Sequence, residues 1–457
     1  MLTGTILLFL LARHYSLQEF GSFTYAFAFG SIAFLLTNFG YNLFTVREIS
    51  RSHISASNAF INTIFIKTFI SLLFVIAIPI YIHLLKIDHL TSTLIWILSI
   101  AFIFNSFQQY VNALFKGTNI FHYESIISFW QNIFIILSAV ICIFFFKTSI
   151  VGIAFLYLIG YVIGALINLD LFLRKNIQEI KHAKFSFGMQ KALFSGVILF
   201  ALHSIFLKIY FETDTLIVGN LLGSTDVAYF QAAMKLVVAV MFISEIPFNS
   251  FYPTISRTLA KNDYSKSIYL VKLMCTAGIF LTAFMVLFSK LIITALYGQR
   301  FQFSANLLFF AAFIIFIRFT AGAFGLILSA GGYQGIQVSA ALSATFVSIM
   351  LNLYLIPVFG LFMAVFTSLI VNLLIFLFYY YQCMKQFHIN FINKEILTII
   401  AIITIMASLF NFAKLNETVL GAIFFVFLAV FIVFLYFRKE IKNILNSMLV
   451  FPVKIFS

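Results

Sequence analysis

The chain has 457 residues, of which 63% are hydrophobic and 9% are charged, and its formal net charge is +14. A soluble globular chain is about 45–50% apolar and about 25% charged, so this composition excludes a water-soluble domain. Many apolar runs reach the roughly 20 residues that a helix needs to cross a bilayer, and they lack the alternation of a membrane β-barrel. We therefore expect an all-α polytopic membrane protein.

Fourteen apolar segments follow one another along the chain, and Gly and Pro residues mark several of their ends. The first segment would reach only about 20 Å as a helix, so we expect the first helix to be incomplete in this sequence. Pro247 and Pro253 are expected to bend or end the eighth segment. The segments lie near residues 1–13, 20–46, 59–85, 90–115, 124–146, 149–173, 191–222, 226–253, 268–296, 303–331, 334–358, 360–383, 396–413 and 417–437.

Lys and Arg residues are unevenly distributed between the two sides of these segments. When the loops are assigned to alternate sides, eighteen lie on one side and six on the other. Because cytoplasmic loops are rich in Lys and Arg, both termini are expected to face the cytoplasm. Topology accounts for the scattered positive charge, and we expect no nucleic-acid partner.

Two stretches half a chain apart are similar. HYSLQEFGSFTYAF begins at His14, LLGSTDVAYFQAAM begins at Leu221, and the offset of 207 residues aligns Gly21 with Ala228. Six segments, a basic linker and six more segments then indicate a parallel repeat, a layout typical of transporters. The expected parts are an N-terminal lobe at 1–173, a cytoplasmic linker at 174–190, a C-terminal lobe at 191–383, and two further helices with a tail at 384–457.

Several stretches resemble the polysaccharide-biosynthesis branch of the multidrug/oligosaccharidyl-lipid/polysaccharide (MOP) exporters. LARHYSLQEFGSF resembles that family's first hairpin, and VREISR resembles the start of the following cytoplasmic loop. ETDTLIVGNLLGSTDVAYFQAAMKL is similar to its seventh and eighth helices. LNLYLIPVFGLFMAVFTSLI is similar to its Asn-x-x-x-Ile-Pro-x-x-Gly segment. The chain departs from the family in its short first helix and at Phe362 and Met363, where small residues usually follow the glycine.

The resemblance implies a Wzx-type flippase with a MATE-like fold. Such proteins move an undecaprenyl-pyrophosphate-linked oligosaccharide repeat unit from the cytoplasmic to the periplasmic leaflet of the bacterial inner membrane. The repeat unit is used for O-antigen (lipopolysaccharide), capsule or exopolysaccharide synthesis. The resemblance also implies alternating access without ATP, coupling to H+ or Na+, and a polymerase and a chain-length regulator as partners.

Three alternatives remain for the function. Two belong to the same superfamily: a drug/cation antiporter and a peptidoglycan lipid-precursor flippase. The third is a membrane polysaccharide polymerase. Positive charges without acidic neighbours inside the segments oppose the antiporter, and short outward loops oppose the polymerase.

Ionisable residues inside apolar segments are the strongest indication of a site. A charge at the bilayer centre costs about 2.5–3.5 kcal/mol, so it normally faces a partner or a wet cavity. Asp214 and Lys235 lie at similar depths on either side of the turn near Ser224, which allows either an ion pair or a place on an ion or substrate path. Lys208 and Glu212 are one turn apart and can neutralise each other.

Lys67 and Arg318 have no acidic residue within one turn of their own segments. We expect both to face a cavity and attract a pyrophosphate or acidic sugars, although Lys67 can instead extend to the cytoplasmic interface. Arg47 and Arg51 flank the predicted cytoplasmic mouth, and Arg13 ends the first segment. Topology alone or capture of lipid phosphate explains these three arginines.

Amide side chains recur at helical spacing and suit the hydroxyl groups of a sugar. Amides also hold membrane helices together, typically for less than about 2 kcal/mol per contact, so adhesion is the alternative to a hydrated lumen. The two sets are Asn105, Gln108, Gln109 and Asn112 in the fourth segment, and Asn38 and Asn42 in the second.

The sequence contains no pattern typical of an enzyme. It has no Gly-rich phosphate loop with Lys and Ser/Thr, and its three cysteines lie in or beside apolar segments without partners. Its eight histidines are scattered without metal-ligand spacing. We therefore expect a transporter with no catalytic residue, cofactor or metal.

Overall fold

The computed structural model describes residues 2–51, 54–120, 122–183, 185, 205–206, 208–210, 212–388, 394–415 and 418–436. Within these ranges every regular element is a helix and no strand occurs. The expected all-α class is therefore confirmed.

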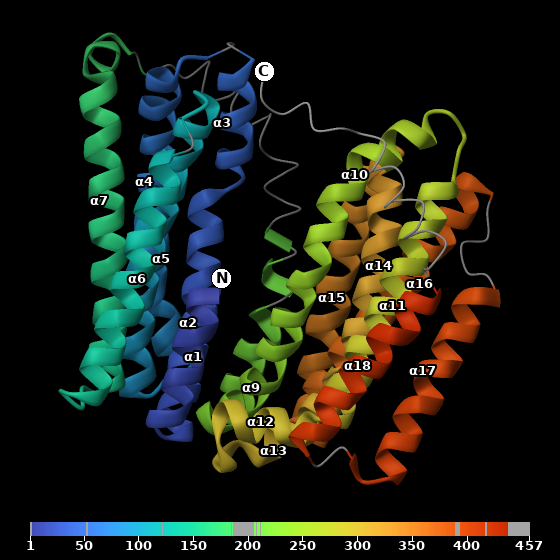
Figure 1. Cartoon of the computed structure of the whole chain (residues 1–457). Coiled ribbons are helices and arrows are strands. Elements are labelled where there is room, and N and C mark those ends of the chain that lie inside the picture. Colours follow the sequence, from blue (N-terminus) through green and yellow to red (C-terminus); the bar gives the residue numbers. More distant parts are fainter. Residues whose placement is uncertain are drawn as a thin grey trace. The chain divides into compact units, whose positions relative to one another are not determined.

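The first part of the chain forms long helices that run alongside one another (Figure 1). Four of them begin after a residue whose side chain accepts a hydrogen bond from the backbone N–H three positions on: Ser16, Ser55, Asp88 and Ser149. At Ser16 the reciprocal bond from Glu19 completes a capping box. These helices are α1 (Leu2–His14), α2 (Leu17–Asn38), α3 (Tyr41–Ser50), α4 (Ala56–Leu84), α5 (His89–Gly117), α6 (His122–Phe144) and α7 (Ile150–His182).

The second part of the chain has more interruptions. A 3-10 helix interrupts the predicted eighth segment just before Pro247, which then lies in the first turn of α10, where proline is tolerated. Pro253 lies inside α10, which continues to Leu259, so Pro253 does not end the helix as expected. Residues 212–222 are also helical. The elements are α9 (Ser224–Met241), η1 (Phe242–Ser244), α10 (Glu245–Leu259), α11 (Ser265–Leu287), α12 (Ser289–Tyr297), η2 (Gln299–Phe301), α13 (Gln302–Ala311), α14 (Phe313–Ala330), α15 (Gln334–Phe359), α16 (Phe362–Phe387), α17 (Lys394–Phe412) and α18 (Val419–Tyr436).

Ten of the described helices are long and apolar enough to cross a membrane. They correspond to ten of the fourteen predicted segments. Among the other four, the first segment forms the short helix α1, and the last two contain the shorter apolar helices within α17 and α18. Half of the seventh segment, 191–222, lies outside the described residues.

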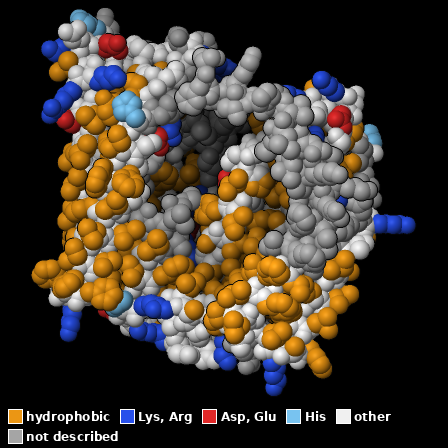
Figure 2. Space-filling model, viewed as in Figure 1, with side chains coloured by type: hydrophobic (Ala, Val, Ile, Leu, Met, Phe, Trp, Pro, Cys, Tyr) orange, Lys and Arg blue, Asp and Glu red, His pale blue; other side chains and the backbone are white. Residues whose placement is uncertain are grey.

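Burial distinguishes the central helices from those that face outward. In the most apolar 18-residue stretch of α2, 78% of the residues are buried, and in that of α5 the share is 56%. In the corresponding stretches of α4 and α6 only 22% of the residues are buried. Exposed Phe65 and Trp130 belong to α4 and α6. On the left of Figure 2, hydrophobic side chains cover most of the visible face, and charged side chains gather at its upper end. Such an apolar outer face suits contact with lipid.

The chain divides into two compact units. One comprises Met1–Lys235 and Val338–Val371, and the other comprises Leu236–Gln337 and Asn372–Ser457. The first unit therefore joins α1–α7 to the hairpin that ends in α9 and to parts of α15 and α16. The two six-helix lobes predicted from the sequence are a different division of the chain and remain a prediction.

The predicted second apolar segment is not one helix. α2 ends at Asn38, and the next two residues, Phe39 and Gly40, adopt left-handed conformations with φ of 42° and 72°. Gly40 adopts this conformation without steric cost. The first residue of α3, Tyr41, is fully buried in an apolar cluster with residues of α4, α5 and α7. Packing of α3 in this cluster stabilises the break.

Candidate functional site

Two lysines and one glutamate form a charged cluster in the first unit. Glu212 begins the helical stretch 212–222, and Lys208 lies one turn earlier, with its Nζ 2.5 Å from Glu212 Oε1. Lys235 of α9 is close enough to Glu212 for an electrostatic interaction, and Ser31 of α2 interacts with the same carboxylate. Side chains from α2 and from the hairpin around Ser224 therefore meet at one carboxylate.

This Lys208–Glu212–Lys235 cluster carries one more positive than negative charge. The Glu212 side chain is only 7% exposed, and that of Lys208 is 32% exposed. Lys235 is half-buried, with its Nζ 5.7 Å from the centre of the Phe27 ring. Because Glu212 can neutralise one lysine, the second positive charge is left to attract an anion, and apolar surroundings strengthen that attraction. The arrangement can bind a phosphate group.

Asp214 points away from this cluster, toward α15 and α16. Its Oδ1 accepts hydrogen bonds from Ser348 Oγ at 3.0 Å and from Asn352 Nδ2 at 2.6 Å, and its Oδ2 accepts one from Ser368 Oγ at 2.6 Å. The ion pair between Asp214 and Lys235 that the sequence allowed is not formed. Residues two positions apart on a helix face roughly opposite sides, so Glu212 takes the side that faces Lys235.

The Asp214 carboxylate has only neutral hydrogen-bond donors, and all four side chains of this group are buried. A buried carboxylate without a cationic partner can take up a proton or a small cation, because either would neutralise its charge. Asn352 Oδ1 is buried here without a hydrogen-bond partner and adds a further oxygen. Among the described residues, no group of three His, Cys, Asp or Glu side chains could hold a metal.

Lys67 of α4 is fully buried. Its Nζ donates hydrogen bonds to Thr37 O at 2.9 Å and to Ser106 Oγ at 2.7 Å, and it lies 5.6 Å from the ring centres of both Phe107 and Tyr110. None of the ion pairs between described residues includes it. In this structure the side chain lies in the packed interior rather than at a cavity surface, and a role in binding substrate remains a prediction.

The amide stripe of α5 faces two directions. Gln108 and Asn112 are buried against neighbouring helices, and Gln108 Nε2 donates to Gln131 Oε1 of α6 at 2.6 Å. Asn105 and Gln109 are half-buried. Sequence reasoning missed Gln131, because it has no amide neighbour at helical spacing on α6.

Asn38 and Asn42 lie on either side of the break between α2 and α3. Both are half-buried, and the Oδ1 atom of each is buried without a hydrogen-bond partner. Because the helix is interrupted between them, they do not form the continuous stripe that their four-residue spacing suggested.

The candidate arginines of the first unit are exposed. Arg47 Nε is 2.9 Å from Glu48 Oε1, and its guanidinium group lies 5.2 Å from the centre of the Phe44 ring. Arg51 lies at the C-terminal end of α3, and Arg13 lies in the last turn of α1. All three are accessible to an anionic ligand.

Arg318 lies in α14 and belongs to the second unit. Its side chain is half-buried and interacts electrostatically with Tyr379 of α16. Its expected role in a substrate cavity remains a prediction.

Sequence reasoning also missed a polar network that joins the two similar hairpins. Tyr25 OH donates to Asn220 Oδ1 at 2.6 Å and lies 2.6 Å from Tyr81 OH. Ser22 Oγ of α2 donates to Ser224 Oγ at 3.0 Å. The network fastens α2 to the turn before α9.

Two glycines allow this close approach. A Cβ atom on Gly21 would lie 1.7 Å from Ser224 O and 3.2 Å from Ala228 N, and one on Gly219 would lie 2.2 Å from the Tyr25 ring. Gly21 and Ala228 are aligned positions of the two similar stretches, so equivalent positions lie against each other. The similarity was visible in the sequence, but the contact was not.

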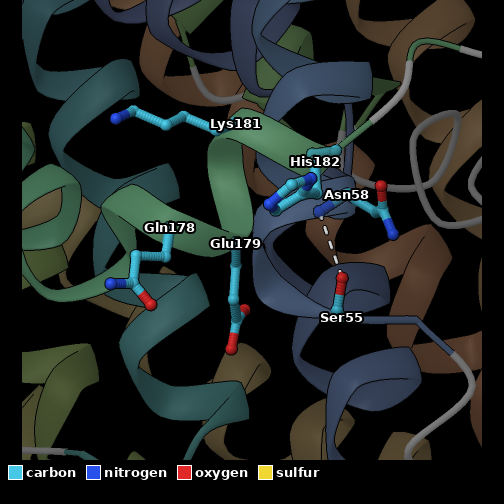
Figure 3. A pocket seen from close by; sticks show the side chains of 7 residues that line it. Ser55, Asn58, Gln178, Glu179, Lys181 and His182 are labelled. Carbon is cyan, nitrogen blue, oxygen red and sulfur yellow. Dashed lines mark hydrogen bonds between the residues drawn. The ribbon is translucent and has the colours of Figure 1, made fainter.

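A separate pocket of about 560 Å³ lies where the start of α4 meets the end of α7 (Figure 3). Amide, acidic and basic side chains line it. Ser57, beside it, donates to Glu179 Oε2 at 3.1 Å. The lining residues are Ser55, Asn58, Gln178, Glu179, Lys181, His182 and Ala183.

Comparison with solved structures identifies the fold. A lipid II flippase MurJ in an inward closed conformation has a TM-score of 0.78 at 14% identity, with 96% of this chain and 97% of that chain covered. An inward-facing multidrug resistance MATE family transporter of the MOP superfamily has a TM-score of 0.68 at 14% identity, with 85% and 94% covered. A MOP superfamily transporter from Pyrococcus furiosus has a TM-score of 0.56 at 12% identity, with 85% and 94% covered.

The protein therefore has the fold of the MurJ and MATE transporters, and the expected MATE-like architecture is confirmed. A family model described as polysaccharide biosynthesis protein matches residues 1–259, which is more than half of the chain. The chain belongs to this polysaccharide biosynthesis protein family. No curated protein sequence matches it.

Proposed function

We propose that this protein flips a lipid-linked oligosaccharide across the membrane for polysaccharide synthesis. Family membership connects the chain to polysaccharides. The observation that carries the proposal is the excess positive charge of the Lys208–Glu212–Lys235 cluster in apolar surroundings. A phosphate-linked sugar headgroup must carry its negative charge through the bilayer, and a buried cation that is not fully neutralised lowers the cost of that passage.

The specific substrate proposed is an undecaprenyl-pyrophosphate-linked repeat unit of an O-antigen, capsule or exopolysaccharide. It would pass from the cytoplasmic to the periplasmic leaflet of the inner membrane by alternating access. Both termini would lie in the cytoplasm, as the distribution of Lys and Arg predicts. A polymerase and a chain-length regulator of the same pathway would receive the product.

The candidate residues fall into three roles under this proposal. Lys208 and Lys235 would attract the pyrophosphate in the membrane. Arg318 of α14 is a separate candidate for phosphate binding within the second unit. The exposed arginines of α1 and α3 would make first contact with the lipid phosphate. The half-buried amide side chains of Asn38, Asn42, Asn105 and Gln109 would form hydrogen bonds with sugar hydroxyls. The buried amides Gln108 and Asn112 would support them from within the helix bundle.

Asp214 would couple transport to a gradient of H+ or Na+. Its support is the burial of an acidic side chain among neutral donors from α15 and α16. Binding of one cation would remove the charge and change what these donors bond to, so the packing of the helices would depend on the ion.

Reconstitution in vesicles tests the proposal. The purified protein is given a defined undecaprenyl-pyrophosphate-linked oligosaccharide, and its appearance in the opposite leaflet is scored with an impermeant glycosidase. We expect flipping by the unmodified protein. Lys235→Gln should reduce the rate roughly 10- to 100-fold, because a hydrogen bond to a charged group contributes about 1.5–3 kcal/mol.

Lys290→Gln is the matched control, because Lys290 is an exposed lysine on α12. It should flip the lipid at the unmodified rate. A normal rate for Lys235→Gln would remove the cluster from the substrate path. No flipping of any lipid-linked oligosaccharide by the unmodified protein would contradict the proposal as a whole.

A second candidate substrate is a peptidoglycan lipid precursor. The similarity to a lipid II flippase, with a TM-score of 0.78, favours it. The same vesicles distinguish the two, because the precursor and the oligosaccharide lipid share the pyrophosphate but differ in the sugar. Preference for the peptidoglycan precursor would replace the first candidate.

A further inference from the structure

The break between α2 and α3 leaves backbone carbonyl groups without their helical donors. In a continuous helix, the Thr37 carbonyl would accept a hydrogen bond from the N–H of Tyr41. Instead, the Phe39 N–H donates to Leu35 O, and the first backbone bond of α3 runs from the Phe44 N–H to Gly40 O. The carbonyl of Thr37 must find another partner.

That partner is Lys67. Its Nζ donates to Thr37 O at 2.9 Å and shares its remaining capacity with Ser106 Oγ at 2.7 Å. The amino group therefore lies at the C-terminal end of α2, where the helix dipole favours positive charge. Lys67 thus caps the C-terminal end of α2, as a lysine side chain can cap the last carbonyl groups of an exposed helix.

The contact lies deep within the bundle. Eleven residues of α4 precede Lys67 and eleven residues of α5 follow Ser106, which places both about 17 Å from those helix ends. Water does not reach Lys67, which is 0% exposed. The faces of Phe107 and Tyr110 complete its surroundings. Every described contact of Nζ is thus with a backbone carbonyl, a hydroxyl or an aromatic ring.

We propose that Lys67 is a positioning residue that holds the break between α2 and α3. Its amino group takes the place of the missing backbone donor, so that the broken form of this helix pair is favoured over a continuous helix. The apolar cluster that contains Tyr41 and Phe44 favours the same form from the other side of the break. Lys67 acts on the direction of α3 and not on the substrate itself.

The direction of α3 sets the positions of Arg47 and Arg51. If these arginines receive the lipid phosphate, as the proposed function has it, Lys67 controls that step indirectly. This consequence rests on the proposed function, whereas the effect of Lys67 on the break does not. A measurement of distance separates the two.

The experiment places spin labels on either side of the break, at Gln18→Cys in α2 and Ser50→Cys in α3, both exposed positions. The three native cysteines are first replaced. A continuous helix would separate residues 18 and 50 by about 48 Å. Double electron–electron resonance should give a shorter distance between the two labels in the protein that keeps Lys67. In Lys67→Met, which keeps the volume but not the donors, we expect a second population near the longer distance.

Two controls distinguish a change at the break from general loss of structure. Ser71→Ala removes a buried hydrogen bond within α4, to Lys67 O, and should leave the distance unchanged. A second label pair at the exposed residues Trp130 and Leu166 should give the same distance in every variant. An unaltered distance between 18 and 50 in Lys67→Met would overturn the proposal.

If Lys67→Met does not accumulate, Lys67→Gln is measured in its place. Glutamine has a donor but is shorter and uncharged, so the longer population is again expected, and its absence again overturns the proposal. A longer population together with normal flipping would keep the role of Lys67 at the break and remove the one proposed for Arg47 and Arg51.

Discussion

The two acidic residues Glu212 and Asp214 illustrate how two positions on one helix separate two roles. Glu212 faces Lys208 and Lys235, whereas Asp214 faces Ser348 and the other donors of α15 and α16. Beside Glu212, the second lysine leaves an excess positive charge that can attract an anion. Beside Asp214, only neutral donors are present, which leaves a place for a cation or a proton.

Asp214→Asn should uncouple transport from the ion gradient. The amide has the shape of the carboxylate but does not change its charge when a cation binds. One charge moving through 100 mV contributes about 2.3 kcal/mol, which is roughly a 50-fold ratio of lipid between the leaflets. We expect this ratio to fall to about 1 in the variant, measured in energised vesicles, while flipping down a lipid gradient continues.

Asp263→Asn is the control for this substitution. Asp263 is an exposed carboxylate in the turn before α11, where the backbone N–H of Ser265 donates to it and lowers its pKa below the ordinary value. Coupling should be unchanged in this variant. An Asp214→Asn protein that still follows the gradient would assign the coupling to another group.

At the scale of elements, α2 packs closely against the second hairpin, which lies about 200 residues further along the chain. Gly21 lies against Ser224 and Ala228, and Tyr25 lies against Gly219. Hydroxyl and amide groups then close the contact with hydrogen bonds. By the predicted topology this contact lies at the outward end of both hairpins, so it would close the outward side.

Gly21→Val should open this contact. The new Cβ would overlap the carbonyl of Ser224, and a backbone carbonyl cannot rotate away as a side chain can. We expect a cysteine at Thr91, a buried residue that bonds Ser22, to react on the order of tenfold faster with an impermeant maleimide. Such a ratio corresponds to about 1.4 kcal/mol in the opening equilibrium.

Gly4→Val is the matched control, because nothing lies within 4 Å of a Cβ atom at Gly4. Its labelling rate should equal that of the parent protein. Equal rates for Gly21→Val and the parent would show that the two hairpins separate readily without the substitution, and the contact would then not be a closure.

At the scale of the whole molecule, orientation in the membrane follows from charge. When loops are assigned to alternate sides of the predicted segments, one side carries three times as many Lys and Arg residues as the other, and the positive-inside rule predicts that this side faces the cytoplasm. The exposed apolar faces of α4 and α6 suit direct contact with lipid.

Cysteines placed at exposed loop positions report this orientation. Lys86→Cys and Lys147→Cys should react with an impermeant reagent in intact cells, because both lie on the side with few positive charges. Lys261→Cys should react only after the membrane is permeabilised. The reverse pattern would invert the topology and move the candidate arginines of α3 to the outside.

Much of the fold could be predicted from local sequence. Ten of the fourteen predicted segments appear as helices long enough to span a membrane, because apolar length and helix punctuation depend on neighbouring residues only. The break after Asn38 was not predicted, since Phe39 is not a residue that marks left-handed backbone. That conformation is held by Tyr41 in the core and by Lys67 from another helix.

The candidate site could be predicted only as a set of residue types. Charges inside apolar segments directed attention to Lys67, Asp214 and Glu212, because such charges are costly in lipid wherever the chain folds. Their partners could not be predicted, except for Lys208, which is one turn from Glu212. The donors to Asp214 lie 134, 138 and 154 residues away in the sequence.

The sequence by itself determined that this protein lies in a membrane, that it is helical and which orientation is expected, because these follow from the composition and charge of each segment. Only the tertiary structure decided that Glu212 meets Lys208 and Lys235, that Asp214 is held by neutral donors, and that Lys67 binds the end of α2. The reason is physical: each of these contacts depends on which helix faces meet, and that is set by packing across the bundle.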